Sequence, residues 1–437
     1  MKILFFLFIS TFTFISVGQN KNTDSTNIKK TREHHKRFGF GGTPILAFDS
    51  DLGLKYGAVI NFFDYGNKFP KYLQYAKIKA FHTTNGTSNL SLIYDNNSLL
   101  KKTKFIFEST YTKDVLLNFY GFNGTKSNYN HSIKDSKSIE YINPYYYTHQ
   151  RQTLKFRLDF QRQINTKKLY LLYGFNFNKY MIDKTDLSKF DFPIGANQTS
   201  NNTSTLFEDY IESKIIPTNE IYGGTFVNLK LGITFDTRNN QINCSDGIFL
   251  ETYLINTPKL MGSEGFTKYI ITFRQYYMIK KINTLITYRI SSQQKLEGKI
   301  PYFYLPTYHD LTIDNDGLGG AYNLRGVSRN RIAANGFIVG NLEVRKNILN
   351  FNFLKQSCKI EVSGFTDFAY ITQEYQFNSD MIISNLFNKK QQKLNYTYGA
   401  GAYLIYNTNN IISANFGISP DKSLGSTGLY IGASFLF

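Results

Sequence analysis

Apolar and polar residues alternate with a period of two along most of the chain between residues 37 and 437. In the segment 154–161, Leu and Phe alternate with Lys, Arg, Asp and Gln, and the segments 227–236 and 429–437 repeat the pattern. Because successive side chains of a β-strand point to opposite faces, each segment has one face suited to lipid and one suited to water. The alternation predicts an all-β protein, although a soluble sandwich would alternate in the same way.

The lengths of the connections between these segments separate the two architectures. About sixteen strands are predicted, an even number as single-chain bacterial barrels require, at 37–48, 52–64, 70–83, 88–96, 103–113, 150–164, 168–181, 224–237, 247–258, 266–281, 284–295, 336–346, 357–372, 396–406, 411–419 and 427–437. With the N-terminus in the periplasm, the long connections all follow odd-numbered strands, at 114–149, 182–223, 296–335 and 373–395. Short periplasmic turns opposite long outer loops favour a transmembrane antiparallel β-barrel.

Composition and charge exclude several other classes of protein. The 437 residues include 33 Tyr and 39 Phe, too many aromatic residues for a disordered chain. Beyond the N-terminus no apolar run approaches the roughly 18 to 20 residues that a membrane helix needs. The net charge is +18, and for an exported protein this favours acidic lipid headgroups or glycans over nucleic acid as partners.

The N-terminus predicts export across the inner membrane. Lys2 precedes an apolar run at 3–17, and the small residues Ser16 and Gly18 fit a cleavage site, so residues 1–18 are predicted to be a signal peptide. Residues 19–36 are polar and are predicted to be a flexible periplasmic tail, which leaves residues 37–437 for the outer-membrane barrel.

Neither cysteine nor histidine indicates a metal, a cofactor or an enzyme. Cys244 and Cys358 match no metal-binding spacing and fall on well-separated predicted strands, so two free thiols are expected. The six histidines are scattered, and no catalytic motif such as G-x-S-x-G or H-E-x-x-H occurs.

The sharpest local feature is the segment 323–327, Asn-Leu-Arg-Gly-Val, which precedes the twelfth predicted strand. By alternation, Glu343 and Asp367 on the next two strands point into the lumen. Arg forms fixed, two-pronged contacts with carboxylates, so Arg325 on a loop that folds inward can pair with either one. Gly326 would allow the loop tip to turn tightly.

These residues resemble those of the BamA/TamA-type bacterial surface-antigen family, whose barrels insert proteins into outer membranes or pass them across. In that family the long sixth outer loop carries a [V/I]-R-G-[F/Y] tip, and its Arg reaches acidic residues on strands twelve and thirteen. The tip here consists of Leu324, Arg325, Gly326 and Val327. The resemblance implies a sixth loop folded into the lumen, in which Arg325 either locks the loop or takes part in transport.

Two further motifs extend the resemblance over the whole predicted barrel. The strand-thirteen motif F-x-D-x-G is matched by Phe365 and Asp367, with Ala369 where Gly is usual. A D-T-R-x-N…P-x-x-G turn is matched by Asp236, Arg238, Asn239 and Gly247, with Cys244 in place of Pro.

The resemblance also implies features of the chain ends. A lateral seam would lie between the first and last strands, where Gly428 and Gly432 either weaken the pairing or relieve crowding. Phe435 and Phe437 resemble the C-terminal recognition signal of outer-membrane barrels, on a lipid-facing strand. Family members that assemble or secrete proteins carry periplasmic polypeptide-transport-associated domains, for which the segment 19–36 is expected to be too short.

The function implied by the resemblance is assistance in inserting or translocating protein or lipid at the outer membrane. Its expected partners are outer-membrane lipid and either client outer-membrane proteins or a separate periplasmic partner. Two alternatives stay open. One is a passive channel that prefers anions because of lumenal cations such as Lys155, Arg157 and Lys230, and the other is a membrane platform for that periplasmic partner.

Overall fold

The computed structural model describes residues 37–66, 72–164, 168–195, 198, 202–260, 264–310, 315–353, 356–377, 386–406 and 410–437. The predicted signal peptide (1–18) and the predicted tail (19–36) lie outside the described residues.

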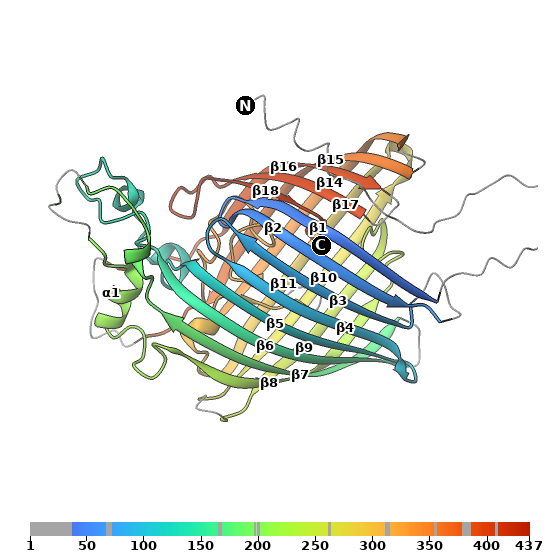
Figure 1. Ribbon diagram of the computed structural model, residues 1–437, viewed down its shortest axis with the longest axis horizontal. Helices are drawn as coiled ribbons and strands as arrows, with labels where there is room; N and C mark the ends of the chain where they lie inside the picture. The colour runs from blue at the N-terminus through green and yellow to red at the C-terminus, as the bar shows by residue number, and fades with distance from the viewer. Residues whose placement is uncertain are drawn as a thin grey trace, which may run out of the picture.

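Sixteen strands of the described residues form one closed antiparallel barrel, as predicted (Figure 1). Each strand pairs with its neighbours in the chain, and β1 closes the barrel against β18. The strands are β1 (Phe38–Asp49), β2 (Gly53–Asp64), β3 (Gln74–Thr83), β4 (Ser88–Leu100), β5 (Thr103–Asn118), β6 (Thr148–Gln163), β7 (Leu169–Asp183), β8 (Gly223–Asp236), β9 (Asp246–Thr257), β10 (Phe266–Ile279), β11 (Thr284–Gly298), β14 (Gly336–Phe353), β15 (Gln356–Gln373), β16 (Asn395–Tyr406), β17 (Asn410–Ile418) and β18 (Thr427–Gly432).

The period of two divides the side chains of the barrel between two environments. On β8, Leu229, Leu231 and Ile233 are exposed on the outer surface, whereas Asn228 and Lys230, which alternate with them, are buried. Apolar residues that face outward suit the hydrocarbon of a bilayer, and polar residues that face inward suit a lumen.

Long loops gather at one end of the barrel, where Figure 1 shows them with the helix α1 (Leu206–Glu212). They follow β5, β7, β11 and β15, the strands after which long outer loops were predicted. The loop between β11 and β14, residues 299–335, also contains the two-stranded sheet of β12 (Thr307–Tyr308) and β13 (Asn315–Asp316). No helix among the described residues is long and apolar enough to cross a membrane.

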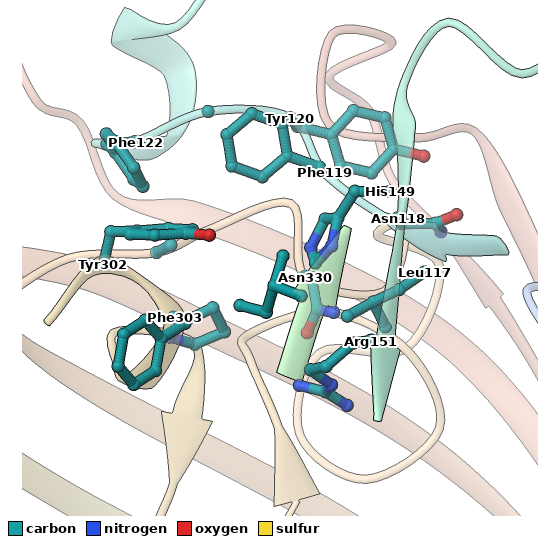
Figure 2. A pocket seen from close by; sticks show the side chains of 14 residues that line it. Leu117, Asn118, Phe119, Tyr120, Phe122, His149, Arg151, Tyr302, Phe303 and Asn330 are labelled. Carbon is teal, nitrogen blue, oxygen red and sulfur yellow. The ribbon is translucent and has the colours of Figure 1, made fainter. Parts of the chain in front are cut away.

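The outer loops pack together into an aromatic cap over this end of the barrel. Most of its buried residues come from the loops after β5, β7, β11 and β15, and they include Phe119, Phe122, Tyr147, Phe207, Tyr210, Tyr302 and Tyr375. Figure 2 shows the rings of Phe119, Phe122 and Tyr302 around a small cavity. The cavity has a volume of about 20 Å³, which is room for about one water molecule, so the loops are closely packed there.

The last strand is shorter than predicted, and the residues after it take a different direction. β18 ends at Gly432, although the alternation continues to Phe437. Phe435 is buried against Tyr403, with 4.9 Å between ring centres, and the Arg345 guanidinium lies 3.9 Å from the centre of its ring. The prediction that Phe435 and Phe437 face lipid is therefore wrong. Contacts with side chains of the inner wall offset the loss of strand pairing after Gly432.

Candidate functional site

Two carboxylates on neighbouring strands form the centre of the candidate site. Glu343 on β14 and Asp367 on β15 are fully buried, whereas Leu342 and Val344, which flank Glu343, are exposed. Asn341 lies opposite Asp367 in the strand register, one inward position from Glu343. The alternation of the hairpin therefore brings both carboxylates to the inner wall at adjacent positions.

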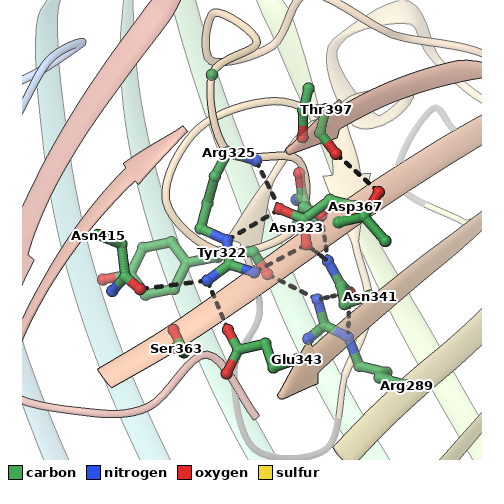
Figure 3. Close-up of polar contacts among 12 residues, drawn as sticks. Arg289, Tyr322, Asn323, Arg325, Asn341, Glu343, Ser363, Asp367, Thr397 and Asn415 are labelled. Carbon is green, nitrogen blue, oxygen red and sulfur yellow. Dashed lines mark hydrogen bonds and ion pairs between the residues drawn. The ribbon is translucent and has the colours of Figure 1, made fainter. Parts of the chain in front are cut away.

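Arg325 from the loop between β11 and β14 bonds to both carboxylates (Figure 3). Its Nε and Nη2 each donate to Asp367 over 2.9 Å, the two-pronged geometry that favours Arg over Lys. Its Nη1 donates to Glu343 Oε1 over 2.5 Å and to Asn415 Oδ1 over 3.3 Å. The guanidinium carbon lies 3.3 Å from the ring centre of Phe365. The structure thus brings together Arg325, Glu343, Phe365 and Asp367.

A second arginine balances the charge of this group. Arg345 donates to Glu343 Oε2 from Nε over 2.7 Å and forms an ion pair through Nη2 at 2.6 Å. Two buried guanidiniums therefore meet two buried carboxylates. Ion pairs removed from water persist only when each charge is compensated and hydrogen-bonded. We name these four residues, Arg325, Glu343, Arg345 and Asp367, the arginine–carboxylate cluster.

The loop tip that carries Arg325 packs closely on the barrel wall. Leu324 and Val327 are buried in an apolar cluster with Leu318, Phe337 and Ile371. Gly326 has φ +95°, in the region that favours glycine, and its N–H donates to Tyr430 Oη over 3.1 Å. All four residues of the predicted tip motif therefore contribute to holding the loop against strands of the wall.

Gly417 on β17 provides the surface on which this tip rests. A Cβ atom at Gly417 would lie 2.6 Å from the carbonyl carbon and oxygen of Arg325. We expect Gly417→Ala to lower the free energy of unfolding by about 1–3 kcal/mol, the usual cost of overpacking, and to expose the loop to protease. Unfolding of the purified barrel by heat would measure this effect. Gly364→Ala is the matched control, because no atom lies within 4 Å of a Cβ there, and equal losses in both variants would contradict the prediction.

A second contact ties the same loop to the turn between β1 and β2. The Arg329 N–H donates to Asp51 Oδ1 over 3.0 Å, and the Asn118 side chain donates to the same oxygen over 3.4 Å. Burial, followed by the charge of Asp49, raises the pKa of Asp51 to about 7. A carboxyl group with this environment holds a proton in the folded state at mildly acidic pH.

This raised pKa predicts a pH dependence of stability. An unfolded Asp has a pKa of about 3.9, so between about pH 4 and pH 7 the folded state binds more protons than the unfolded state. The stabilisation from protonated Asp51, measured as free energy of unfolding, is then fully present below about pH 4 and is lost as the pH rises through about 7. We expect the melting temperature to fall between pH 5 and pH 8, and Asp51→Asn to reduce that fall. If the melting temperatures of the wild type and Asp51→Asn change equally with pH, Asp51 is not the source of the pH dependence.

Arg331 is a functional candidate that the sequence did not single out. It is buried and donates to the carbonyl oxygens of Ser423, Gly124 and Ser127 over 2.8, 2.8 and 3.1 Å. Its guanidinium also lies 5.6 Å from the ring centre of Tyr120. Arg331 therefore joins three outer loops. Its partners are mainly backbone carbonyls, which leave no signature in the sequence.

The predicted turn motif lies apart from the arginine–carboxylate cluster. Asp236 ends β8, Arg238 and Asn239 follow in the connection, and Gly247 lies at the start of β9, at the end of the barrel opposite the long loops. Arg238 pairs with Asp236 through two hydrogen bonds of 3.0 and 2.9 Å. Gly247 has φ +118°, and Cys244 and Cys358 are both buried free thiols. This motif shapes a turn and contributes nothing to the cluster.

The seam between β1 and β18 is paired over a short distance. Among the described residues, Phe48 with Ile431 and Asp49 with Tyr430 are in register there, and the Ser50 N–H donates to the Leu429 carbonyl just beyond them. By contrast, β1 and β2 pair along their full length from Phe38 to Asp49. A Cβ at Gly428 would lie 2.2 Å from Tyr430 Oη, and Gly432 is the last residue of β18. Gly428 therefore makes room for Tyr430, and the pairing of β18 with β1 ends at Ile431, one residue before the strand itself ends.

A cavity of about 790 Å³ lies beside this seam. Its wall includes the β1 residues from Thr43 to Asp49, Arg325 at the loop tip, and the C-terminal residues from Tyr430 to Leu436. The loop tip, the weakly paired strands and the inward C-terminal segment thus border one space. The described residues contain no group of three or more His, Cys, Asp or Glu placed to bind a metal ion.

Comparisons with known proteins agree with this architecture. The model of the Omp85 superfamily domain matches residues 118–423. The crystal structure of BamA from Haemophilus ducreyi lacking POTRA domains 1–3 is similar, with a TM-score of 0.56 and 12% identity over 92% of this chain and 71% of that one. CdiB from Escherichia coli gives a TM-score of 0.56 and 9% identity over 92% of this chain and 63% of that one. No curated protein matches the chain in sequence. The chain belongs to the Omp85 superfamily, and its barrel is an outer-membrane protein.

Proposed function

We propose that this protein assists the insertion or translocation of protein or lipid at the outer membrane, and that it acts at the seam between β1 and β18. One observation carries the proposal: two residue pairs join these strands, and a cavity of about 790 Å³ lies behind them. Antiparallel pairs are held by their ladders of hydrogen bonds, so a short ladder is the place where a closed barrel opens at least cost.

The loop between β11 and β14 would support this activity from inside the barrel. We place its tip in the lumen, because Arg325 bonds to Glu343 and Asp367, whose neighbours along the strands face outward. In this position the arginine–carboxylate cluster stiffens β14 and β15, and Gly326 bonds to Tyr430 of β18. The loop thus contacts both sides of the seam, β18 through Tyr430 and the turn after β1 through Asp51, and opening would have to occur along the unpaired part of β1 below that turn.

The aromatic cap argues against a passive channel. An open pore needs a continuous aqueous path, whereas the loops after β5, β7, β11 and β15 bury their aromatic side chains against one another. Two of the three predicted lumenal cations are also neutralised, since Lys230 pairs with Asp159 at 3.3 Å and Arg157 with Glu108 at 2.8 Å. The purified protein should therefore conduct little in planar bilayers. Steady anion-selective steps would favour the channel instead.

Depletion in the native host tests the proposed function. The outer-membrane proteome and lipids would be quantified after depletion, with the wild type, Gly417→Ala or Gly364→Ala supplied as the complementing copy. We expect a loss of other outer-membrane proteins, or a change in outer-leaflet lipid, that the wild type and Gly364→Ala restore. Affinity purification from the same membranes would identify a separate periplasmic partner. An unchanged proteome together with an unchanged lipid composition would refute the proposal.

A further inference from the structure

Two lysines lie side by side on the wall of the cavity beside the seam. Lys55 on β2 and Lys79 on β3 both line it, and their ammonium groups lie 4.6 and 5.5 Å from the centre of one ring, that of Phe81. Gly57 lies opposite Phe81 in the strand register, and a Cβ there would lie 2.1 Å from the Ala80 carbonyl oxygen and 2.6 Å from the Phe81 Cα, so this glycine lets β2 and β3 approach closely beside the ring. Two positive charges are therefore held near each other around an apolar ring.

The charge of these lysines is not balanced locally. Within the described parts of the chain, no carboxylate oxygen lies within 4 Å of either ammonium group. Lys77 adds a third positive charge close to Lys79, and Glu108 is the acidic group that acts on Lys79. Asp49 also lines the cavity, on β1. Glu108 already forms an ion pair with Arg157 at 2.8 Å. Like charges on a partly buried wall repel one another, so this wall favours a bound anion.

The remainder of the cavity is suited to an apolar chain. Ile45 and Val59 line it on the β1 and β2 side, and Ile411, Phe435 and Leu436 line it on the C-terminal side. The volume of about 790 Å³ lies within the usual range for small-molecule sites, which combine apolar walls with a few polar groups. A ligand with an anionic head and an acyl chain would satisfy both parts of the wall.

A route for such a ligand lies along β1. Residues 43–47 of β1 border the cavity, and β18 pairs with β1 only at Phe48 and Asp49. On the other side, residues 433–436 continue after the end of β18 and bend inward. Within the described chain, residues 43–47 of β1 therefore have no partner strand on the β18 side. They lie between the cavity and the lipid outside the barrel.

We infer that this cavity binds an anionic amphiphile, with a phosphate or carboxylate head between Lys55 and Lys79 and an acyl chain along the apolar wall. Lysine binds such groups as a point charge and needs no fixed geometry, and basic pockets next to lipid take acidic headgroups. The inference goes beyond the proposed function, because binding to the purified barrel requires no insertion or translocation activity.

A fluorescence titration tests the inference. The chain contains no Trp, so Phe81→Trp gives a single reporter between the two lysines. The probes are brominated phosphatidylglycerol and brominated oleate, with brominated phosphatidylcholine for comparison, added to the purified full-length protein in detergent. We expect saturable quenching by an anionic probe, with an affinity at least tenfold lower in Lys55→Gln/Lys79→Gln. The control Lys280→Gln/Lys281→Gln removes two charges from the turn between β10 and β11 and should leave this affinity unchanged.

The outcomes distinguish a phospholipid from a free fatty acid and include results that would overturn the inference. Quenching by phosphatidylglycerol alone supports a phospholipid, and quenching by oleate alone supports a free fatty acid. Equal quenching by phosphatidylcholine, or equal affinity in Lys55→Gln/Lys79→Gln, would overturn the inference. Full displacement by inorganic phosphate at the concentration of the lipid would also overturn it, since a simple anion site would remain. The comparison with phosphatidylcholine and the displacement by inorganic phosphate use only the protein that keeps both lysines. They therefore test the inference even if the double variant does not fold.

Discussion

Arg325→Ala is expected to lower the free energy of unfolding by about 3–5 kcal/mol, the usual cost of removing one partner from a buried ion pair. Arg345 would still compensate Glu343, but Asp367 would keep hydrogen bonds from Asn341 and the backbone and no cation. The measurement is heat unfolding of the purified barrel, followed by the shift in electrophoretic mobility and by protease digestion of the loop.

A second-site change distinguishes an unpaired charge from a general loss of packing. Arg325→Ala/Asp367→Asn removes the uncompensated carboxylate and should recover part of the lost stability, because replacing both partners of a pair costs less than removing one. Arg325→Lys should fall between the wild type and Arg325→Ala, since an ammonium group cannot reproduce the two 2.9 Å bonds to Asp367. If Arg325→Ala were as stable as the wild type, the arginine–carboxylate cluster would contribute no net stability.

The architecture of the barrel was predictable because two independent regularities agreed. Alternation gave the two faces, and the position of the long loops after odd-numbered strands selected a barrel. Both depend on local sequence, so they hold without knowledge of tertiary contacts. The structure confirms the closed barrel of sixteen strands. It also extends β14 to Phe353, past the predicted end at residue 346, since its pairing with β15 continues that far.

The contacts of the loops and of the C-terminal segment were less predictable. Alternation continues through Phe435 and Phe437, and nothing local shows that the chain bends after Gly432 toward Arg345 and Tyr403. The aromatic cap joins segments more than a hundred residues apart, as where Asn123 bonds to Tyr375. The tip motif could be found, because a charged residue beside glycine stands out in a loop and two inward carboxylates were available as partners.

A disulfide bond across the seam is expected to abolish the activity of the protein while leaving its barrel at least as stable. Phe48 and Ile431 are in register across β1 and β18, so Phe48→Cys/Ile431→Cys would hold the two strands together. Cys244 and Cys358 are free thiols and would first be replaced by Ser. The readout is growth and outer-membrane composition in the depleted host, with and without reductant.

The control places the same bond where no opening is proposed. Ala402 and Ala414 are in register across β16 and β17, which pair from Tyr398 to Tyr406, so Ala402→Cys/Ala414→Cys should complement fully. A cross-link across the seam constrains the unfolded chain and should raise resistance to heat, so a misfolded barrel and a locked one differ in this measurement. If the barrel with the β1–β18 bond complements without reductant, the seam need not open. The short ladder between these strands would then be a structural feature alone, and the proposed site of action would have to lie elsewhere on the barrel.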